Sequence, residues 1–517
     1  MSSPSELKLE TDQLAHVKFD GYDVESTTSA ALIARRAKHF AGSFLFYQDP
    51  IEIVSGKGAR LTDQKGRQYI DFYNNVQSMG HSNPDVARAI AKAYATLTTH
   101  TRYLNKEVIE LAEEAVATLP GELDVCLFVN SGTEAAELAM RIARVVTGKT
   151  GIAVLENSYH GNSKLVGEMS TGTYPAANRP DYIQAIAPPN LYRGQFTSAN
   201  SDPATLGRRY ADLLYPAIDA LERNGHGLSA FVCDSIFDSH GVLEAPADYF
   251  QQVYRKVRAA GGLCVADEVQ AGVCRTGTFW GFEQYDVIPD IVFCGKPFGC
   301  GYPVAAVFTT RAIADYWAKR DIYFNTFGGN PVAAAAARAV IHYARRNNIP
   351  THVNEMGRHL RKKLGELAQR HPMIGNIRGK GLFVGVELVK DQGTKEPATD
   401  IARYIPDEMK KRGVLIGLSG PLGNCLKFRP PLVITKADID RTVRIFDEVL
   451  TRLRRQAKKG AMSSVGRVNE GIVNERVVLA ANKRDQRELS VSRSVAITPL
   501  AWDLARQLGV KLHRDRF

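Results

Sequence analysis

Short apolar runs alternate with helix-like stretches along much of this chain, from about residue 71 to about residue 330. Two of the helix-like stretches cover residues 208–223 and 250–260. This order predicts an α/β fold in which a parallel sheet is wrapped by helices. Because 517 residues exceed what one hydrophobic core usually contains, a second lobe is expected. We place this smaller α+β lobe at residues 331–455, beginning with the alanine-rich helix 331–346.

Two ionisable residues follow apolar runs of the predicted sheet. Lys296 comes just after residues 289–294, between a glycine and a proline. Burial disfavours the ammonium form, and a neutral, positioned amine is what Schiff-base chemistry requires. Asp267 ends the apolar run 263–267, and ligands bind at the carboxyl ends of parallel strands in such sheets. Each residue also has an ordinary interpretation, Lys296 as a strand-end lysine and Asp267 as a helix cap.

Three further segments suit an anion or an aromatic ligand. The apolar run 125–129 leads through Ser131 and Thr133 into an alanine-rich helix, whose first N–H groups can bind a phosphate. A plain helix cap without a ligand gives the same pattern. Tyr159 follows another apolar run, where its ring either stacks on a ligand or covers the end of the sheet. Thr326, beside two glycines, again suits a bound oxyanion.

Taken in chain order, these motifs resemble those of the class III aminotransferases, the fold type I branch of the pyridoxal-phosphate enzymes, over roughly residues 40–455. The resemblance implies a large domain, residues 71–330, with a mostly parallel seven-stranded sheet sandwiched by helices. It implies that an N-terminal segment, residues 1–70, packs on the small domain. It also implies a homodimer or a tetramer whose active sites are shared between subunits.

The resemblance further implies a role for each motif residue. Lys296 would form the Schiff base with pyridoxal 5′-phosphate and move protons. Asp267 would pair with the ring nitrogen, whose positive charge makes the cofactor an electron sink. The other implied contacts are to the phosphate (Ser131, Gly132, Thr133, and Thr326 from the neighbouring subunit), to the ring face (Tyr159) and to the ring hydroxyl (Gln270). No metal ion is expected.

Residues 426–432 set this chain apart from the usual aminotransferases. Those carry an arginine for the substrate carboxylate where Lys427 stands here, and a lysine cannot make the two-pronged contact. Arg429 is nearby, at a position where the family has a small residue. The chain instead resembles phospholyases that act on phosphoethanolamine and related amino-alcohol phosphates, in segments 71–76, 101–104, 324–332, 374–385 and 388–391. Such a substrate needs a second phosphate site, and the candidate residues are Arg102, Asn74, Asn75 and Lys427. For Arg102 the alternative is a solvated arginine at a helix end.

We therefore expect a phospholyase that eliminates phosphate from phosphoethanolamine or 1-aminopropan-2-ol phosphate, giving an aldehyde, ammonia and phosphate. Phosphate leaves more readily than hydroxide, so elimination can outrun transamination when the C–O bond is aligned with the π-system. The alternative function is an aminotransferase that passes an amine to pyruvate or 2-oxoglutarate. A non-enzymatic scaffold comes third, and the retention of Lys296, Asp267 and the phosphate-binding segment argues against it.

The distribution of charge and the spacing of the cysteines limit the kinds of binding partner and the cellular location that we expect for this protein. The net charge is +11, but residues 451–517 hold 15 Lys and Arg against 6 Asp and Glu, so the preceding residues carry only +2. The basic excess belongs to the tail, and no nucleic-acid partner is needed to explain it. The seven cysteines follow no metal-ligand spacing, which favours reduced thiols and a cytoplasmic location. Neither a signal peptide nor a membrane span is expected.

Residues 456–517 predict a basic flexible linker that ends in an amphipathic helix. Thr498 is its expected N-cap, Pro499 its first residue and Gly509 its stop. Its apolar stripe consists of Leu500, Ala501, Leu504, Ala505 and Leu508. So short a helix needs a surface to dock on, either its own enzyme or a partner. Residues 497–510 resemble the terminal helices that sort cargo enzymes into bacterial microcompartments, which would make a shell protein the partner.

Overall fold

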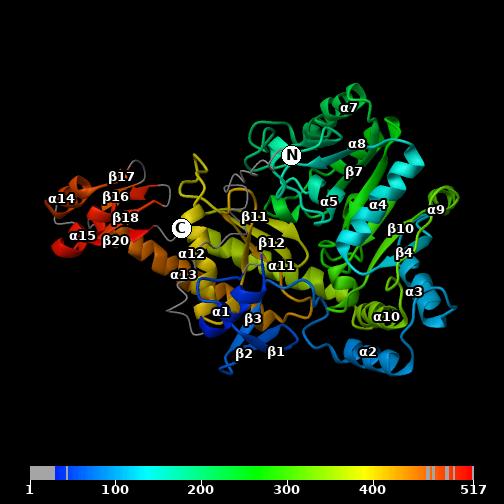
Figure 1. The fold of residues 1–517 in the computed structure, drawn as a ribbon, viewed down its shortest axis with the longest axis horizontal. Coiled ribbons are helices and arrows are strands. Elements are labelled where there is room, and N and C mark those ends of the chain that lie inside the picture. The colour runs from blue at the N-terminus through cyan, green and yellow to red at the C-terminus, as the bar shows by residue number, and fades with distance from the viewer. Residues whose placement is uncertain are drawn as a thin grey trace, which may run out of the picture. The chain divides into compact units, whose positions relative to one another are not determined.

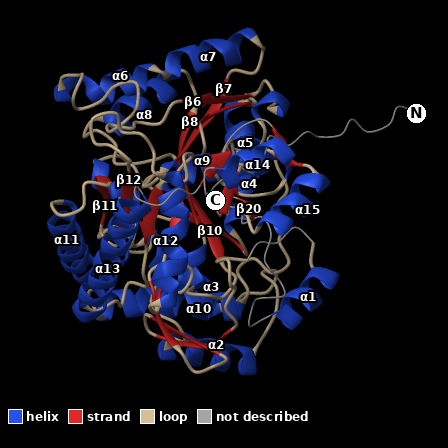
Figure 2. Ribbon diagram, turned by 90° about the vertical axis from the view of Figure 1, so that its left-hand side faces the viewer, coloured by secondary structure: helices blue, strands red, loops and turns tan. Residues whose placement is uncertain are grey.

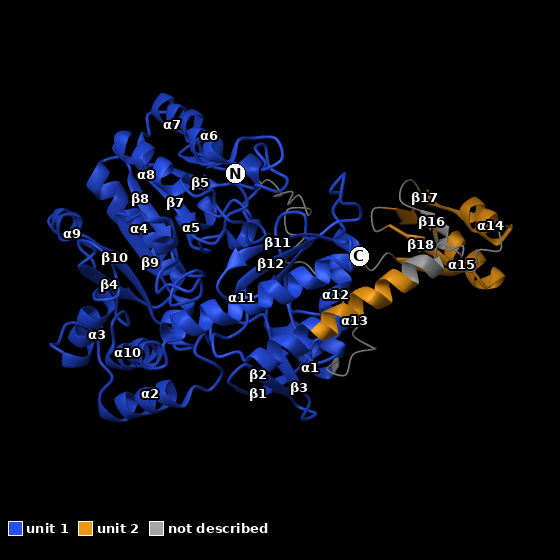
Figure 3. Cartoon of the chain, turned by 180° about the vertical axis from the view of Figure 1, so that it is seen from behind, with its two compact units in different colours: residues 1–443 blue, residues 444–517 orange. Residues whose placement is uncertain are grey.

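The computed structural model describes residues 30–41, 45–460, 466–468, 472–483, 488–492 and 495–514. The chain divides into two compact units, residues 1–443 and residues 444–517 (Figure 3). Helix α13, Lys436–Gly460, spans the boundary between them. In the described residues, the first unit contains one seven-stranded and two four-stranded sheets, and the second unit contains a three-stranded and a two-stranded sheet.

The seven-stranded sheet is the centre of the first unit (Figure 1). Its strand order is β4-β10-β9-β8-β7-β5-β6, and only β10 runs antiparallel to its neighbours. The sheet therefore confirms the mostly parallel, seven-stranded fold type I architecture. The strands are β4 Val125–Val129, β5 Gly151–Leu155, β6 Ile183–Ile186, β7 Leu228–Asp234, β8 Leu263–Asp267, β9 Ile291–Cys294 and β10 Ala305–Thr309.

Helices cover both faces of this sheet, as the continuous apolar strands require. Val265 of β8 belongs to the core shared with helix α4, Gly132–Thr147. The neighbouring residue Cys264 points the other way, and its Sγ lies 3.6 Å from the carbonyl oxygen of Tyr254 in α8, Tyr249–Ala259. Figure 2 shows the strands between the helices. The remaining helices of this region are α5 Lys164–Met169, α6 Leu206–Asp212, α7 Leu214–Arg223 and α9 Arg311–Ala318.

Two smaller sheets complete the first unit. One has the order β1-β2-β3-β13 and joins Gln68–Asp71 to Val414–Leu415 through parallel pairing. The other has the order β11-β12-β15-β14 and is antiparallel. Their strands are β1 Ile53–Lys57, β2 Arg60–Asp63, β3 Gln68–Asp71, β11 Ile374–Lys380, β12 Phe383–Leu388, β13 Val414–Leu415, β14 Gly417–Ser419 and β15 Cys425–Phe428. The other α-helices of the first unit are α1 Ala30–His39, α2 Pro84–Thr96, α3 Lys106–Val116, α10 Pro331–Arg346, α11 Ile349–Ala368 and α12 Thr399–Lys411.

The second unit has a hydrophobic core of its own, so the prediction of a flexible linker over residues 456–517 is wrong for its described residues. Part of this core comes from strands of only two to four residues, which are too short for a periodic signal, and the rest comes mainly from α14 and α15. Helix α15 starts at the Thr498 cap and ends at Gly509, as predicted. Its Ala501 and Ala505 are buried in this core beside α14. The elements are β16 Gly466–Val468, β17 Ile472–Val473, α14 Glu475–Lys483, β18 Glu488–Val491, β19 Ala496–Ile497, α15 Pro499–Leu508 and β20 Lys511–Arg514.

Three general features concern the thiols, metal binding and membrane spans. All seven cysteines are free thiols. Within the described ranges, no group of three or more His, Cys, Asp and Glu residues could hold a metal ion. No helix in the described part of the chain is long and apolar enough to cross a membrane.

Candidate active site

A cavity of about 820 Å³ lies where three neighbouring parallel strands end. Asp234 ends β7, Asp267 ends β8, and Lys296 follows β9 by two residues. The volume is within the range of about 300–1,000 Å³ typical of small-molecule sites. Eight residues singled out from the sequence line this one cavity: Ser131, Gly132, Thr133, Tyr159, Asp267, Gln270, Lys296 and Lys427.

Lys296 supplies the cavity with an amine, and the residue is half-buried. It opens the short 3-10 helix Lys296–Gly299 with a left-handed φ of 32°. Burial lowers the pKa of Lys296, and the positive charge of Arg429 lowers it further, against the opposing effect of Asp267. The amine therefore loses its proton at a lower pH than an ordinary lysine does. A neutral amine is the form that attacks a carbonyl carbon.

Asp267 is held in one orientation at the end of β8. One carboxylate oxygen accepts a hydrogen bond from the backbone N–H of Val269 at 3.0 Å, and the other lies 2.7 Å from Nδ1 of His160. Asp267 and His160 are 4% and 5% exposed. His160 directly follows Tyr159 in the sequence, but no pattern there predicts its contact with Asp267. Tyr159 itself is 46% exposed and lines the cavity, so its ring is available for stacking.

The start of α4 forms an open cradle for an anion. Ser131 caps this helix by accepting a hydrogen bond from the N–H of Glu134 at 3.2 Å. Gly132 and Gly161 keep the cradle free, because a Cβ on either would lie within 3.0 Å of a neighbouring side chain. For Gly161 that neighbour is the Thr133 hydroxyl, at 2.7 Å. Free N–H groups, hydroxyls and the positive end of the helix dipole are what a phosphate group binds.

A buried ion cluster closes another side of the cavity. Lys427 Nζ lies 2.9 Å from one oxygen of Asp238, and Arg429 Nη1 lies 3.5 Å from the other. Burial alone would raise the pKa of Asp238, but these two cations bring it below its ordinary value. Burial and the nearby charge of Asp267 raise the pKa of Asp234. Asp234 and Asp238 are not among the residues predicted from the sequence, although Asp234 ends an apolar strand just as Asp267 does.

Four predicted residues lie outside the cavity lining of this chain. Arg102 is exposed, with its guanidinium 4.0 Å from the centre of the Phe324 ring. Asn74 stabilises a turn by accepting a hydrogen bond from Val76 N–H at 3.1 Å, and Asn75 is buried and donates to Gln270. Direct substrate contacts by these residues therefore gain no support from the geometry. Thr326 is exposed, and its role in the neighbouring subunit's site stays a prediction.

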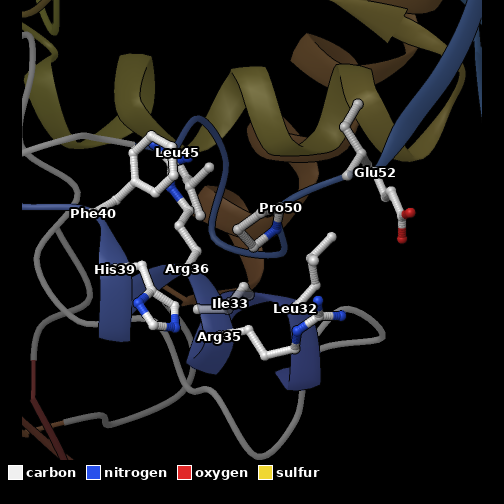
Figure 4. A pocket seen from close by; sticks show the side chains of 10 residues that line it. Leu32, Ile33, Arg35, Arg36, His39, Phe40, Leu45, Pro50 and Glu52 are labelled. Carbon is white, nitrogen blue, oxygen red and sulfur yellow. The ribbon is translucent and has the colours of Figure 1, made fainter.

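A second cavity, of about 440 Å³, lies beside α1 and lacks this chemistry (Figure 4). Among the described residues that line it, Glu52 is the one carboxylate, and none is a lysine, a cysteine or a serine. The labelled side chains are mostly apolar or basic: Leu32, Ile33, Arg35, Arg36, His39, Phe40, Leu45 and Pro50. The cavity at the ends of β7, β8 and β9 is the candidate active site.

Comparison with known proteins agrees with this geometry. The sequence profile described as Aminotransferase class-III matches residues 47–450. The chain belongs to this family. A Drosophila melanogaster relative, "Alanine--glyoxylate aminotransferase 2-like", is 37% identical over 91% of this chain and 97% of its own length. "Ethanolamine-phosphate phospho-lyase homolog 1" from Caenorhabditis elegans is 37% identical over 84% of this chain and 98% of its own length. The solved structure of an Arthrobacter phospholyase in complex with phosphoethanolamine is 40% identical, with a TM-score of 0.78, over 81% of this chain and 99% of its own.

As a class-III aminotransferase family member, the protein is an enzyme that depends on pyridoxal 5′-phosphate. The donor set in the cavity fits this cofactor. The amine of Lys296 suits its aldehyde, the carboxylate of Asp267 suits its ring nitrogen, and the open start of α4 suits its phosphate. Residues after position 450 lie beyond the matched part of the chain.

Proposed function

We propose that this enzyme is a phospholyase that eliminates phosphate from a small amino-alcohol phosphate, of the phosphoethanolamine or 1-aminopropan-2-ol phosphate type. The observation that carries the proposal is Lys427, a cation that lines the cavity and is paired with Asp238 at 2.9 Å. It stands where the usual aminotransferases have an arginine, and an ammonium suits a phosphate but not the two-pronged grip on a carboxylate. The Arthrobacter and C. elegans relatives support the same substrate class.

Each of the cavity residues is assigned one role in this reaction. When bound, pyridoxal phosphate supplies an electron sink for the charge that forms on the substrate carbon. We assign to Lys296 the removal of the proton from the carbon that bears the amine. Asp267, oriented by His160, would pair with the cofactor ring nitrogen and favour its protonated form, while Ser131, Gly132 and Thr133 would hold the cofactor phosphate. Lys427 binds the phosphate that leaves from the adjacent carbon, and hydrolysis with one water gives aldehyde and ammonia.

One assay tests this function. Purified, cofactor-loaded enzyme is incubated with phosphoethanolamine in the absence of any 2-oxo acid, and phosphate and acetaldehyde are measured over time. Repeated turnover without an acceptor is the expected result. A requirement for a 2-oxo acid would contradict the proposal.

The second candidate function is an aminotransferase that passes an amine to pyruvate or 2-oxoglutarate. The relatives named as alanine–glyoxylate aminotransferases favour it. Such an enzyme would convert an amine donor and a 2-oxo acid at equal rates and would release no phosphate. The same assay, with and without pyruvate or 2-oxoglutarate, separates the two functions.

We further propose that the enzyme is a homodimer or a tetramer of such dimers. Large apolar side chains near the loop that carries Thr326 are exposed in the single chain, with Leu104 at 96%, Ile322 at 91% and Phe327 at 68%. A second copy of the chain would cover them and would bring Thr326 to the neighbouring cofactor phosphate. Light scattering on the purified protein tests this, because a monomer would contradict it.

The second unit leads to a proposal about location. We infer a cytoplasmic enzyme that binds a microcompartment shell protein through residues 497–510. Ala501 and Ala505 are used in the unit's own core, but Leu500 and Trp502 of α15 remain 64% and 39% exposed. Such exposed apolar side chains on a small unit suit a protein partner. A shell would also retain a volatile aldehyde product.

A further inference from the structure

Arg429 lies between Gln270 on one side of the active site and Asp238 on the other. It follows strand β15 and is 3% exposed. Its backbone N–H donates to the carbonyl of Phe72 at 2.7 Å, and its Nε donates to the carbonyl of Tyr73 at 3.0 Å. Its guanidinium also lies over the rings of Tyr73 and Phe383, at 5.1 Å and 5.4 Å from their centres. These contacts leave the side chain little freedom to move.

The outer end of this guanidinium contacts Gln270, which lines the cavity. Arg429 Nη1 donates to Gln270 Oε1 at 2.8 Å, and Asn75 Nδ2 donates to the same oxygen. An arginine can only donate, so the Gln270 atom facing it must be the amide oxygen. With that oxygen bound twice, the group that Gln270 can offer to the cavity is its Nε2 amide. Gln270 is thereby fixed as a hydrogen-bond donor.

Arg429 also reaches the substrate side of the cavity. Its Nη1 lies 3.5 Å from the Asp238 oxygen that Lys427 does not contact. Asp238 is thus shared by two cations, and the cluster of Lys427, Arg429 and Asp238 keeps a net positive charge. Because Lys427 gives one of its three N–H groups to Asp238, two remain for an anionic ligand.

We propose that Arg429 is a positioning residue that fixes Gln270 as a donor toward the cofactor ring and keeps Lys427 available to an anion. This inference goes beyond the proposed function and needs only that pyridoxal phosphate is bound, whichever reaction follows. The family has a small residue at this position, so the arrangement is particular to chains with an arginine here. Arg429 contacts neither substrate nor cofactor in this account and acts through its neighbours.

The test is a pH titration of the visible absorption of the cofactor bound to Lys296, which requires no substrate. A donor beside the ring hydroxyl and a nearby cation both favour loss of the proton from the imine that links Lys296 to the cofactor. Arg429→Ala should therefore raise the titration midpoint by about one pKa unit. Arg429→Lys keeps the charge but cannot reach Tyr73, Gln270 and Asp238 together, so it should raise the midpoint by a smaller amount.

Two controls keep the result interpretable. Arg361→Ala removes an arginine of α11 that donates to the carbonyl of Gly381, between β11 and β12, and this variant should titrate as the wild type does. Cofactor content and thermal unfolding establish that each variant is folded, and Arg429→Lys decides the case where Arg429→Ala does not fold. An unchanged midpoint in folded, loaded Arg429→Lys and Arg429→Ala would overturn the inference. If the wild-type enzyme shows no phospholyase activity but the variants shift the midpoint, the positioning role of Arg429 is supported and only the proposed reaction is rejected.

Discussion

Replacing Lys427 with methionine tests how the enzyme binds its substrate phosphate. Methionine has a similar length and no charge, so Lys427→Met removes the ammonium while filling the same space. Asp238 keeps Arg429 at 3.5 Å as a counter-ion, so the remaining carboxylate is not left without a cation. The fold should therefore survive, and the effect should appear in substrate binding.

The expected magnitude follows from the hydrogen bonds of Lys427. One of its N–H groups is held by Asp238, and at least one of the others would reach the substrate phosphate. A hydrogen bond to a charged group contributes about 1.5–3 kcal/mol, which corresponds to about 10- to 150-fold in kcat/KM. Inhibition by added inorganic phosphate should weaken in parallel, because it relies on the same contact.

The assay is steady-state release of acetaldehyde from phosphoethanolamine, with inorganic phosphate as inhibitor. The matched control is Lys256→Met, because Lys256 is also 8% exposed and is paired with Asp212 at 2.8 Å, outside the cavity lining. This control should keep the wild-type kcat/KM. A Lys427→Met enzyme with wild-type kcat/KM and unchanged phosphate inhibition would refute the assignment of Lys427.

Three other predictions address the cradle, a buried acid and the second unit. Gly161→Ala places a Cβ 2.7 Å from Thr133 Oγ1, so cofactor affinity should fall about 5- to 150-fold from strain of about 1–3 kcal/mol. Gly148→Ala, with nothing within 4 Å of the added Cβ, should keep that affinity in a cofactor titration, and equal losses in both variants would contradict the argument. Burial raises the pKa of Glu268 from 4.5 to about 7. Below about pH 4.5 Glu268 is protonated in both the folded and the unfolded protein, and folding has no cost from its charge. As the pH rises from there through about 7, the free energy of unfolding should fall by about 3 kcal/mol. Thermal unfolding should therefore show Glu268→Gln gaining stability relative to wild type from about pH 5 to about pH 8, and a pH-independent difference would count against it. Deletion of residues 460–517 should leave turnover intact and abolish co-purification with shell proteins, whereas lost turnover would mean that the second unit supports the enzyme body.

The sequence predicts the parts of the fold that local patterns determine. Strands β4 and β8 have the predicted bounds, because each is an apolar run that stops at a polar residue. Helix α10 covers Pro331–Arg346 as predicted, because Asn330 caps it and Pro331 suits its first position. Lys296 and Asp267 could be predicted to share one cavity, because ligands bind at the carboxyl ends of parallel strands.

The rest depends on contacts between distant residues, which one sequence does not reveal. The pairing of Asp238 with Lys427 joins positions 189 residues apart. In the sequence, Arg429 is noticed only because the family has a small residue at that position. The fold is needed to show that its guanidinium donates to Gln270. The fold of the second unit was not predicted for a related reason. Strands β17 and β19 have only two residues each, and they are stabilised by pairing with each other and not by a local sequence pattern.

The most direct test of the reaction compares the wild-type enzyme with Lys296→Ala on phosphoethanolamine, without a 2-oxo acid, and identifies every product. The account predicts phosphate, acetaldehyde and ammonia in equal amounts from the wild type and none of them from Lys296→Ala. Release of phosphate together with ethanolamine would show hydrolysis, and phosphate release by Lys296→Ala at the wild-type rate would show that the amine takes no part. Either result would contradict the account.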